Sequence, residues 1–440
     1  MLRTKVIDLF SGKHVHQLYN LYKVTQWYSS MEMSDFQLEK LKKLLSHCYY
    51  NVEFYRDIMT KKKINPKDIK SKDILKEFPI ITKETIQTNY RDFIPLNIKD
   101  LKGVKASQTG GTTGSILVKR TDANVRSSTW ASFMRFYDWM KVSENDHKLR
   151  LMGGHINKDL SRMHKLKNAL NDFLTNTKSF NPYDLSESNI QSIINELKKD
   201  KYKLLKGYSQ NLYFLSQIFK DRNLYFNVPA ITTTAEPLMP EQRDFFKEVF
   251  KAESYDQYGC GEIGGIAYEC DQHQGLHVTE ERVLLEFSDT NDMIITDLDN
   301  YSMPYIRYNN GDQAVLSPEP CTCGRKSLLL KQILGRTCDY LTCTDGKQLH
   351  WAYFWHLLFD TNIAVKRKMK KFQVLQKSVS QIDFRIVSDP LDSTDKEILE
   401  GYIREKLGNV NVTFIQEMEI EPSVSGKFRP VVNLTLNQAK

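Results

Sequence analysis

Positions 107–115, with the sequence Ser-Gln-Thr-Gly-Gly-Thr-Thr-Gly-Ser, form the first stretch of the chain that could do chemistry. Gly110, Gly111 and Gly114 allow tight turns, in which backbone N–H groups can converge on an anion. The hydroxyl groups that could also donate to phosphate oxygens belong to Ser107, Thr109, Thr112 and Thr113. The stretch is either a phosphate-binding loop or a flexible polar loop. It is not a Walker A loop, because no Gly-Lys-Ser/Thr closes it.

Three cysteines and one histidine form a second group of interest, made of Cys270, His277, Cys321 and Cys323. These residue types can supply a closed, tetrahedral zinc site, which would pin two loops together in a structural role. His273 competes with His277 as the fourth ligand, and buried free thiols are the alternative to a metal. An odd total of seven cysteines argues against a disulfide framework.

Residues 1–60 are expected to be helical, since Leu38, Leu41, Leu45 and Cys48 recur at three- and four-residue spacing. Thr82 is the expected N-cap of a later helix, and Asp122 that of another. Strands are predicted at 116–118, 149–152, 202–205 and 230–234, alternating with helices up to about residue 260. This alternation predicts an α/β fold with a largely parallel sheet.

Beyond residue 276 the period changes to that of strands, predicted at 277–287, 292–298 and 313–316. The last hundred residues indicate a small α+β unit. Its expected elements are a hairpin of 372–376 with 382–387, a helix capped by Ser393 or Thr394 and ending at Leu407, and a strand at 412–415. We therefore predict a large N-terminal domain, residues 1–335, and a small C-terminal domain, residues 336–440.

The composition is that of an ordinary globular protein, with 40% hydrophobic and 26% charged residues. The net charge of +8 suits anionic small molecules and is too diffuse to indicate nucleic-acid binding. No run approaches the length of a membrane span, and the N-terminus lacks the apolar core of a signal peptide. We expect a cytoplasmic protein. The oligomeric state stays open, with a homodimer among the options.

Several short segments follow the glycine loop in a distinctive order. They are Thr-Ala-Glu-Pro at 234–237, Tyr-Gly-Cys-Gly-Glu at 258–262, Thr-Asp-Leu at 296–298, Pro-Tyr-Ile-Arg-Tyr-Asn-Asn-Gly-Asp at 304–312, Gly-Arg-Thr-Cys-Asp at 335–339 and Ser-Gly-Lys-Phe-Arg at 425–429. Together they resemble the adenylate-forming superfamily of acyl-CoA synthetases. The series is most similar to the branch of phenylacetate–CoA ligases and CapK-type proteins of capsular polysaccharide biosynthesis. The resemblance runs from about residue 38 to 430.

The resemblance implies that a carboxylic acid attacks the α-phosphate of ATP, which gives acyl-AMP and pyrophosphate, and that a mobile C-terminal domain then completes a second half-reaction. Glu262 would hold Mg²⁺ and Lys427 would bridge the acid and the α-phosphate. Asp312 would bind the ribose, and Arg336 the ribose or phosphate. The remaining expected ATP/AMP-binding residues are the glycine loop with Ala235, Glu236, Pro237, Tyr258 and Gly259. Relatives often show a Cys…His…Cys-x-Cys-Gly-Arg pattern, which residues 321–325 echo.

Two departures from the family pattern stand out. Gly261 replaces the Thr or Ser that usually precedes the glutamate, so one hydroxyl contact to phosphate is missing. Cys338 stands at the usual acidic hinge position, although Asp339 follows it. A non-acidic hinge does not forbid domain rotation.

The sequence does not identify the acid, for which we expect pocket walls at 151–155, 207–210 and 232–234. We favour a non-CoA acceptor, as in polysaccharide biosynthesis, because the run after the hinge keeps only Gly346 among bulkier residues. An aryl- or acyl-CoA ligase is the alternative. A catalytically inactive nucleotide-binding scaffold and a P-loop NTPase are the alternatives of other classes. The first would have no use for Lys427, and the second lacks the loop lysine.

Overall fold

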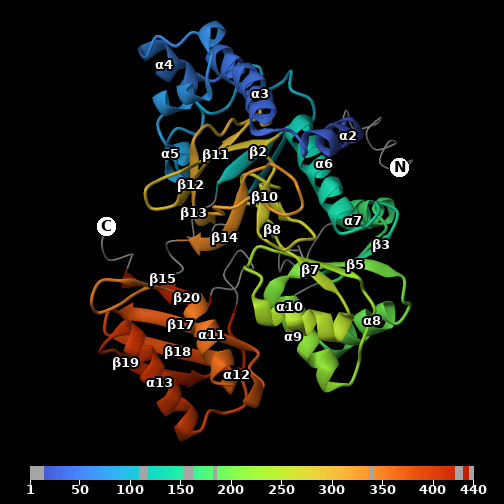
Figure 1. Ribbon diagram of the computed structural model, residues 1–440, viewed down its shortest axis with the longest axis vertical. Helices are drawn as coiled ribbons and strands as arrows, with labels where there is room; N and C mark the ends of the chain where they lie inside the picture. Colours follow the sequence, from blue (N-terminus) through green and yellow to red (C-terminus); the bar gives the residue numbers. More distant parts are fainter. Residues whose placement is uncertain are drawn as a thin grey trace. The chain divides into compact units, whose positions relative to one another are not determined.

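The computed structural model describes residues 14–108, 117–151, 162–181, 186–336, 340–421 and 430–435. The chain separates into two compact units, which divide between Leu334 and Gly335. Figure 1 shows the helices and strands of each unit, coloured along the sequence from the N-terminus to the C-terminus.

The first unit begins with helices, as predicted. The helices are α2 (Val15–Thr25), α3 (Ser30–Asn51), α4 (Glu53–Lys61) and α5 (Lys83–Thr88), with short 3-10 turns at Pro66–Asp68 and Lys72–Glu77. The Ser29 side chain caps α3 in a capping box with Glu32, and Thr82 caps α5 in the same way with Thr85. The α3 face that carries Leu41, Leu44, Leu45 and Cys48 is fully buried.

A five-stranded parallel sheet forms one layer of this unit, in the order β4-β3-β5-β6-β7. Its strands are β3 (His147–Leu151), β4 (Thr177–Ser179), β5 (Tyr202–Tyr208), β6 (Ala230–Thr234) and β7 (Glu253–Tyr255). The helices of this part are α6 (Ala123–Trp139), α7 (Arg162–Leu174), α8 (Glu187–Leu197), α9 (Ser209–Asp221) and α10 (Pro240–Phe250). The predicted alternation is confirmed here, and Asp122 caps α6 as expected by accepting from Val125 N.

A seven-stranded sheet follows in the chain, in the order β11-β12-β13-β14-β10-β9-β8. Its strands are β8 (Gln257–Tyr258), β9 (Ala267–Glu269), β10 (Leu276–Val278), β11 (Val283–Phe287), β12 (Asp292–Asp297), β13 (Tyr308–Leu316) and β14 (Leu329–Arg336). A two-stranded sheet pairs β1 (Lys105–Gln108) with β2 (Val118–Thr121). The apolar core under the large sheet joins Leu41 and Leu45 of α3 to Ile295, Tyr305 and Tyr308.

The second unit is a small α+β unit built on a four-stranded sheet, in the order β19-β18-β17-β20. The predicted hairpin is present, since β17 and β18 pair antiparallel. The strands are β15 (Tyr340–Thr342), β16 (Gln348–His350), β17 (Lys371–Ser378), β18 (Gln381–Val387), β19 (Asn411–Gln416) and β20 (Val431–Asn433). The helices are α11 (Ala352–Asp360), α12 (Ile363–Lys366) and α13 (Ser393–Leu407). Stacked Phe372 and Phe384, with ring centroids 5.9 Å apart, lie at its centre.

Three local predictions were wrong. The cap of α13 is Asp392, whose carboxylate accepts from Asp395 N, so Ser393 already belongs to the helix. Of the strand expected at 116–118, residue 116 lies outside the described residues, Leu117 is not in a strand, and Val118 begins β2, which runs on to Thr121. The run 277–287 is two strands of different partners, because the chain turns between Val278 and Val283. That turn carries Glu281 and Arg282, which are both buried.

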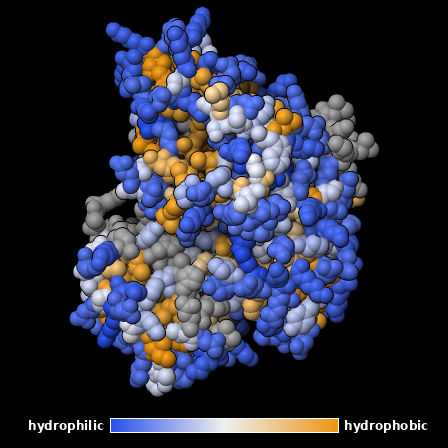
Figure 2. Space-filling view, viewed as in Figure 1, coloured by the Kyte–Doolittle hydropathy of each residue, from blue (hydrophilic) through white to orange (hydrophobic). Residues whose placement is uncertain are grey.

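The face in Figure 2 is mainly hydrophilic, with smaller apolar areas between the polar side chains. Within the part of the chain that the structure describes, no helix is both long and apolar enough to cross a membrane.

Candidate active site

Glu262 lies in the loop between β8 and β9, and close backbone packing shapes that loop. Ile266 N donates to Tyr258 O over 3.0 Å, and Cys260 N donates to Ile263 O over 2.9 Å. Gly259 permits this because a Cβ there would stand only 2.9 Å from the backbone nitrogen of Gly265. The side chain of Glu262 is mostly buried, at 8% exposure. The fold therefore presents a fixed carboxylate from a tightly packed loop.

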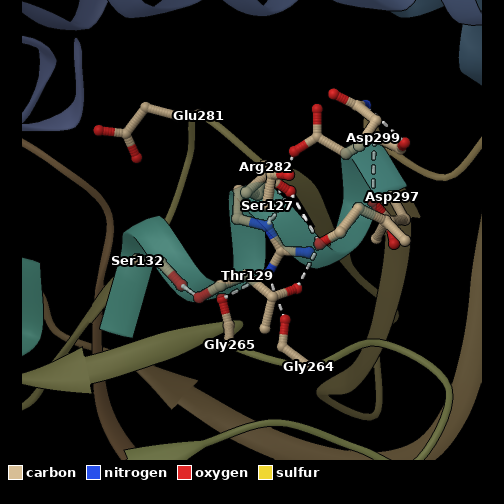
Figure 3. A network of polar contacts seen from close by, with 12 residues as sticks. Ser127, Thr129, Ser132, Gly264, Gly265, Glu281, Arg282, Asp297 and Asp299 are labelled. Carbon is tan, nitrogen blue, oxygen red and sulfur yellow. Dashed lines mark hydrogen bonds and ion pairs between the residues drawn. The ribbon is translucent and has the colours of Figure 1, made fainter. Parts of the chain in front are cut away.

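The buried side chain of Arg282 points toward Gly264 and Gly265 of this loop (Figure 3). Its guanidinium donates to Gly264 O and, over 3.2 Å, to Gly265 O. Its Nε donates to Ser128 Oγ over 3.0 Å and lies 3.6 Å from Asp299 Oδ2. Arg282 therefore connects the Glu262 loop to α6 and to the end of β12. We did not predict this role, because the contacts come from segments far apart in sequence.

The carboxylate of Asp297, in the predicted Thr-Asp-Leu segment, belongs to the same network. It accepts a hydrogen bond from Asp299 N over 3.0 Å. Burial raises the pKa of Asp297 to about 6, and the nearby charge of Arg282 opposes that rise. The Thr-Asp-Leu segment therefore helps to hold the Glu262 loop, and Asp297 is not among the described residues that line the cavity.

Tyr258 and Asp312 come from different strands and meet in one hydrogen-bonded cluster. Tyr258 Oη donates to Asp312 Oδ2 over 2.6 Å. Asn310 Nδ2 donates to both, over 2.7 Å to the hydroxyl and 2.9 Å to the carboxylate. Burial, followed by the charge of Asp312, raises the pKa of Tyr258 well above its ordinary value. The phenol is therefore a neutral donor that orients the carboxylate.

The segment at 234–237 follows β6 directly. Ala235 has φ +70°, a left-handed conformation that is uncommon for a residue with a side chain and is often kept at functional sites. Glu236 accepts from Gln210 N over 3.0 Å and from Ser209 Oγ over 3.2 Å. Pro237 O accepts from the same hydroxyl. Glu236 therefore ties this segment to the first turn of α9.

Parts of the predicted site lie outside the described residues. These are Thr109, Gly110, Gly111, Thr112, Thr113, Gly114, Cys338, Asp339 and Lys427. Ser107 is described, in β1, where it pairs with Lys119 of β2. Arg336 is described only as the last residue of β14.

A cavity of about 490 Å³ opens beside these elements in the first unit. Ser107 and Glu262 line it, as do apolar side chains that include Trp130, Met134 and Leu174. Its size is that of a small-molecule pocket. The expected pocket walls at 151–155, 207–210 and 232–234 stay a prediction, and residues 152–155 lie outside the described residues. The described lining contains Arg150 and Lys206, not residues 151, 207–210 or 232–234.

Four potential metal ligands do converge, within 4.8 Å of one another: Cys270, His277, Cys321 and Cys323. Cys270 Sγ lies 3.6 Å from Cys321 Sγ, and His277 Nε2 lies 3.3 Å from Cys323 Sγ. Zn–S bonds of about 2.3 Å in a tetrahedron put two sulfurs about 3.8 Å apart. His277 Nδ1 contacts Ser327 Oγ at 2.9 Å, as a metal-binding imidazole usually contacts a second partner. The donor set and spacing fit zinc.

His273, the competing ligand, lies elsewhere. Its Nδ1 is 3.2 Å from Glu269 Oε1, and it is not in the cluster. Arg325, just after Cys323, stacks over Trp139 and Trp27, with its Cζ 4.3 Å and 5.0 Å from the two ring centroids. The cysteine loop is thereby attached to α6 and to the segment after α2.

No family model matches the chain. It is 24% identical to the phenylacetate–coenzyme A ligase of Thermus thermophilus, over 90% of this chain and 96% of that one. It is 26% identical to protein CapK of Staphylococcus aureus, over 70% and 69% of the two chains. A solved 2-hydroxyisobutyryl-CoA ligase in complex with R3-HIB-AMP superimposes with a TM-score of 0.73 at 16% identity, covering 94% and 93% of the chains.

The fold and these relatives make the chain an adenylate-forming ligase. Within that superfamily its sequence is similar to a phenylacetate–CoA ligase and to a CapK protein.

Proposed function

We propose that this chain adenylates a carboxylic acid with ATP and Mg²⁺, and that it then passes the acyl group to an acceptor other than coenzyme A. The observation that carries the first step is the shared cavity. Glu262 and Ser107, which come from the segments expected to meet ATP, line the same space as the apolar wall of Trp130, Met134 and Leu174.

In the first step a carboxylate oxygen of the acid attacks the α-phosphorus, the bond to the bridging oxygen breaks, and pyrophosphate leaves. Glu262 would hold Mg²⁺, since a buried carboxylate at the cavity wall is a suitable ligand for a hard cation. Asp312, oriented by Tyr258, would accept the ribose hydroxyls. Residues 235–237 would lie along the adenine. Lys427 would stabilise charge that develops at the α-phosphate.

The second step is attack of an amine or hydroxyl group on the acyl carbon, with loss of AMP and a proton. The likeness to CapK supports a non-CoA acceptor, as do the bulky residues around Gly346 in the loop after the hinge position. Gly346 lies at φ +83° in the turn that joins β15 to β16. The backbone of this glycine is therefore needed for the left-handed conformation of the turn. Coenzyme A is the second candidate, because the phenylacetate–CoA ligase aligns with more of the chain than CapK does.

The four-ligand cluster would hold one structural zinc ion, with all four positions filled by protein. Such an ion would join the end of β9 and the start of β10 to the loop before β14.

A screen of carboxylic acids for ATP-dependent pyrophosphate release tests the first step, with mass spectrometry for the acyl-AMP. With the acid identified, the same mixture plus coenzyme A tests the second. Rapid turnover to the acyl-CoA thioester would refute the non-CoA acceptor and leave the adenylation proposal standing.

A further inference from the structure

Among the described residues that line the cavity, positive charges outnumber negative ones. Its cationic residues are Lys119, Arg126, Lys148, Arg150 and Lys206, and its acidic residues are Glu144 and Glu262. If Glu262 holds Mg²⁺, the excess of positive charge grows. Lys119 and Arg126 donate to backbone carbonyls at Gly261 and at Gly103 and Thr121, so they already have structural partners.

The other three cations form a cluster at the parallel sheet. Arg150 of β3 and Lys206 of β5 stand directly opposite each other in register, and Lys148 lies two residues before Arg150 on the same face. Parallel α/β sheets bind ligands beyond the carboxyl ends of their strands, and both Arg150 and Lys206 lie near those ends.

Two of these three cations, Lys148 and Arg150, already have polar partners within the protein. Lys148 Nζ donates to the carbonyls of Glu144 and Asp146 over 2.9 Å and 2.8 Å. Arg150 pairs with Asp172 over 3.0 Å and donates to Ser179 Oγ over 3.0 Å.

Lys206 differs. Its Nζ donates to Tyr137 Oη over 2.6 Å and lies 5.1 Å and 5.0 Å from the ring centroids of Phe133 and Tyr137. Among the described residues, no carboxylate lies within ion-pair distance of this ammonium. The rings favour a cation but cannot neutralise it.

We infer that the acid accepted by this cavity carries a second anionic group, a carboxylate or a phosphate, that pairs with Lys206 beside Arg150. The inference rests on the proposed adenylation, in which the first carboxylate is the one activated. The apolar wall of Trp130, Met134 and Leu174 would contact the body of the acid. Three donors on Nζ leave room for an anion besides Tyr137.

The electrostatics agree. Burial, and next the charge of Arg150, lower the pKa of Lys206 to about 7. A bound anion would favour the charged form and raise that pKa again.

Matched acids provide the test: succinate with butyrate, terephthalate with 4-methylbenzoate, and 3-phosphonopropionate with butyrate. We expect the dianionic member of at least one pair to give a kcat/KM for pyrophosphate release at least about tenfold higher, the scale of a bond between charged groups. The first two pairs report a carboxylate and the third a phosphate-like group. Consistent preference for the monoacids would overturn the inference and leave adenylation intact.

Lys206→Met removes the charge and keeps the chain length, and Lys203→Met, at an exposed position of the same strand, is its control. Lys206→Met should lower kcat/KM for the preferred diacid by about tenfold and leave its matched monoacid within about twofold. An equal loss for both acids would assign Lys206 a purely structural role.

If no acid gives pyrophosphate, the proposed function fails, and calorimetric titration of the same acids without ATP decides the inference separately. Diacid binding that Lys206→Met weakens about tenfold, and Lys203→Met does not, would support it. Absent diacid binding, or binding equal in the two variants, would overturn it.

Discussion

The hydroxyl of Tyr258 donates to the carboxylate of Asp312 over 2.6 Å, and it links the Glu262 loop to strand β13. Asn310 donates to both groups, so the carboxylate has a fixed orientation. A ribose that binds Asp312 would therefore meet an acceptor that is already in place.

Asp312→Ala should raise the KM for ATP by roughly tenfold or more, because it removes a charged acceptor. Tyr258→Phe should raise it by about fivefold, since one orienting bond of about 1 kcal/mol is lost. Steady-state kinetics with varied ATP measures both, with Asp289→Ala at an exposed loop position as the control. An unchanged KM in Asp312→Ala would contradict the ribose assignment.

Lys427→Ala should lower the rate of adenylate formation by about two to three orders of magnitude, as removal of one transition-state donor does. ATP affinity should change little, because the charge acts on the transition state. Single-turnover formation of acyl-AMP and equilibrium ATP binding separate the two effects. Adenylation close to wild type would exclude Lys427 as the catalytic lysine.

Arg282→Leu should cost about 3–5 kcal/mol of unfolding free energy, because it removes the buried cation beside the carboxylate of Asp297 and leaves Asp299 paired with Lys40 alone. Lys62→Met, in the exposed pair with Glu77, is the control and should cost about 0.5 kcal/mol or less. Urea unfolding followed by circular dichroism measures both. Equal losses in the two variants would contradict the buried-network interpretation.

The Arg282→Leu loss should also depend on pH. The pKa of Asp297 is about 6 in the folded chain and 3.8 ordinarily, so the folded state binds more protons between these values. The contribution of Asp297 to the free energy of unfolding therefore falls as the pH rises from about 4 to about 6. Without Arg282 the folded pKa rises further, and the loss should be larger at pH 7 than at pH 5.

Purified chain should contain one zinc ion, and removal of that ion should lower the thermal midpoint, because binding energy at a closed site is folding energy. Cys323→Ser should lose the ion, whereas His273→Ala should retain it, since His273 pairs with Glu269. Elemental analysis with thermal scans checks this. Zinc retained in His277→Ala and lost in His273→Ala would mean that the ligands were assigned wrongly.

Local signals predicted much of the fold. Thr82 and Asp122 cap helices as expected, because an N-cap depends on neighbours three residues away. The parallel strands were predicted because buried strands form continuous apolar runs. Asp392 was missed as the cap of α13 since Ser393 and Thr394 have the same capping chemistry.

Long-range features were harder to predict. The residue types alone indicated a possible metal site at Cys270, His277, Cys321 and Cys323, and the structure places these four side chains close together. Arg282 carried no signal, because its role depends on carbonyls and carboxylates from other strands. Arg150 and Lys206, which line the cavity, each directly precede one of the pocket walls expected from the sequence. Successive side chains of a strand point to opposite faces of the sheet, so a shift of one residue decides which side chains face the cavity. Here Arg150 and Lys206, which are paired in register, line it.

Cys270 and Cys321 are 51 residues apart, and a metal bound to both would close that stretch into a ring. Arg282, Asp297 and Asp312 all lie inside the ring. Closing such a loop costs the unfolded chain about 3.5 kcal/mol of conformational freedom. If the metal bound early in folding, its binding energy would offset this entropic cost before the site residues come together. The supply of metal during synthesis would then govern how quickly the chain reaches its folded, active state.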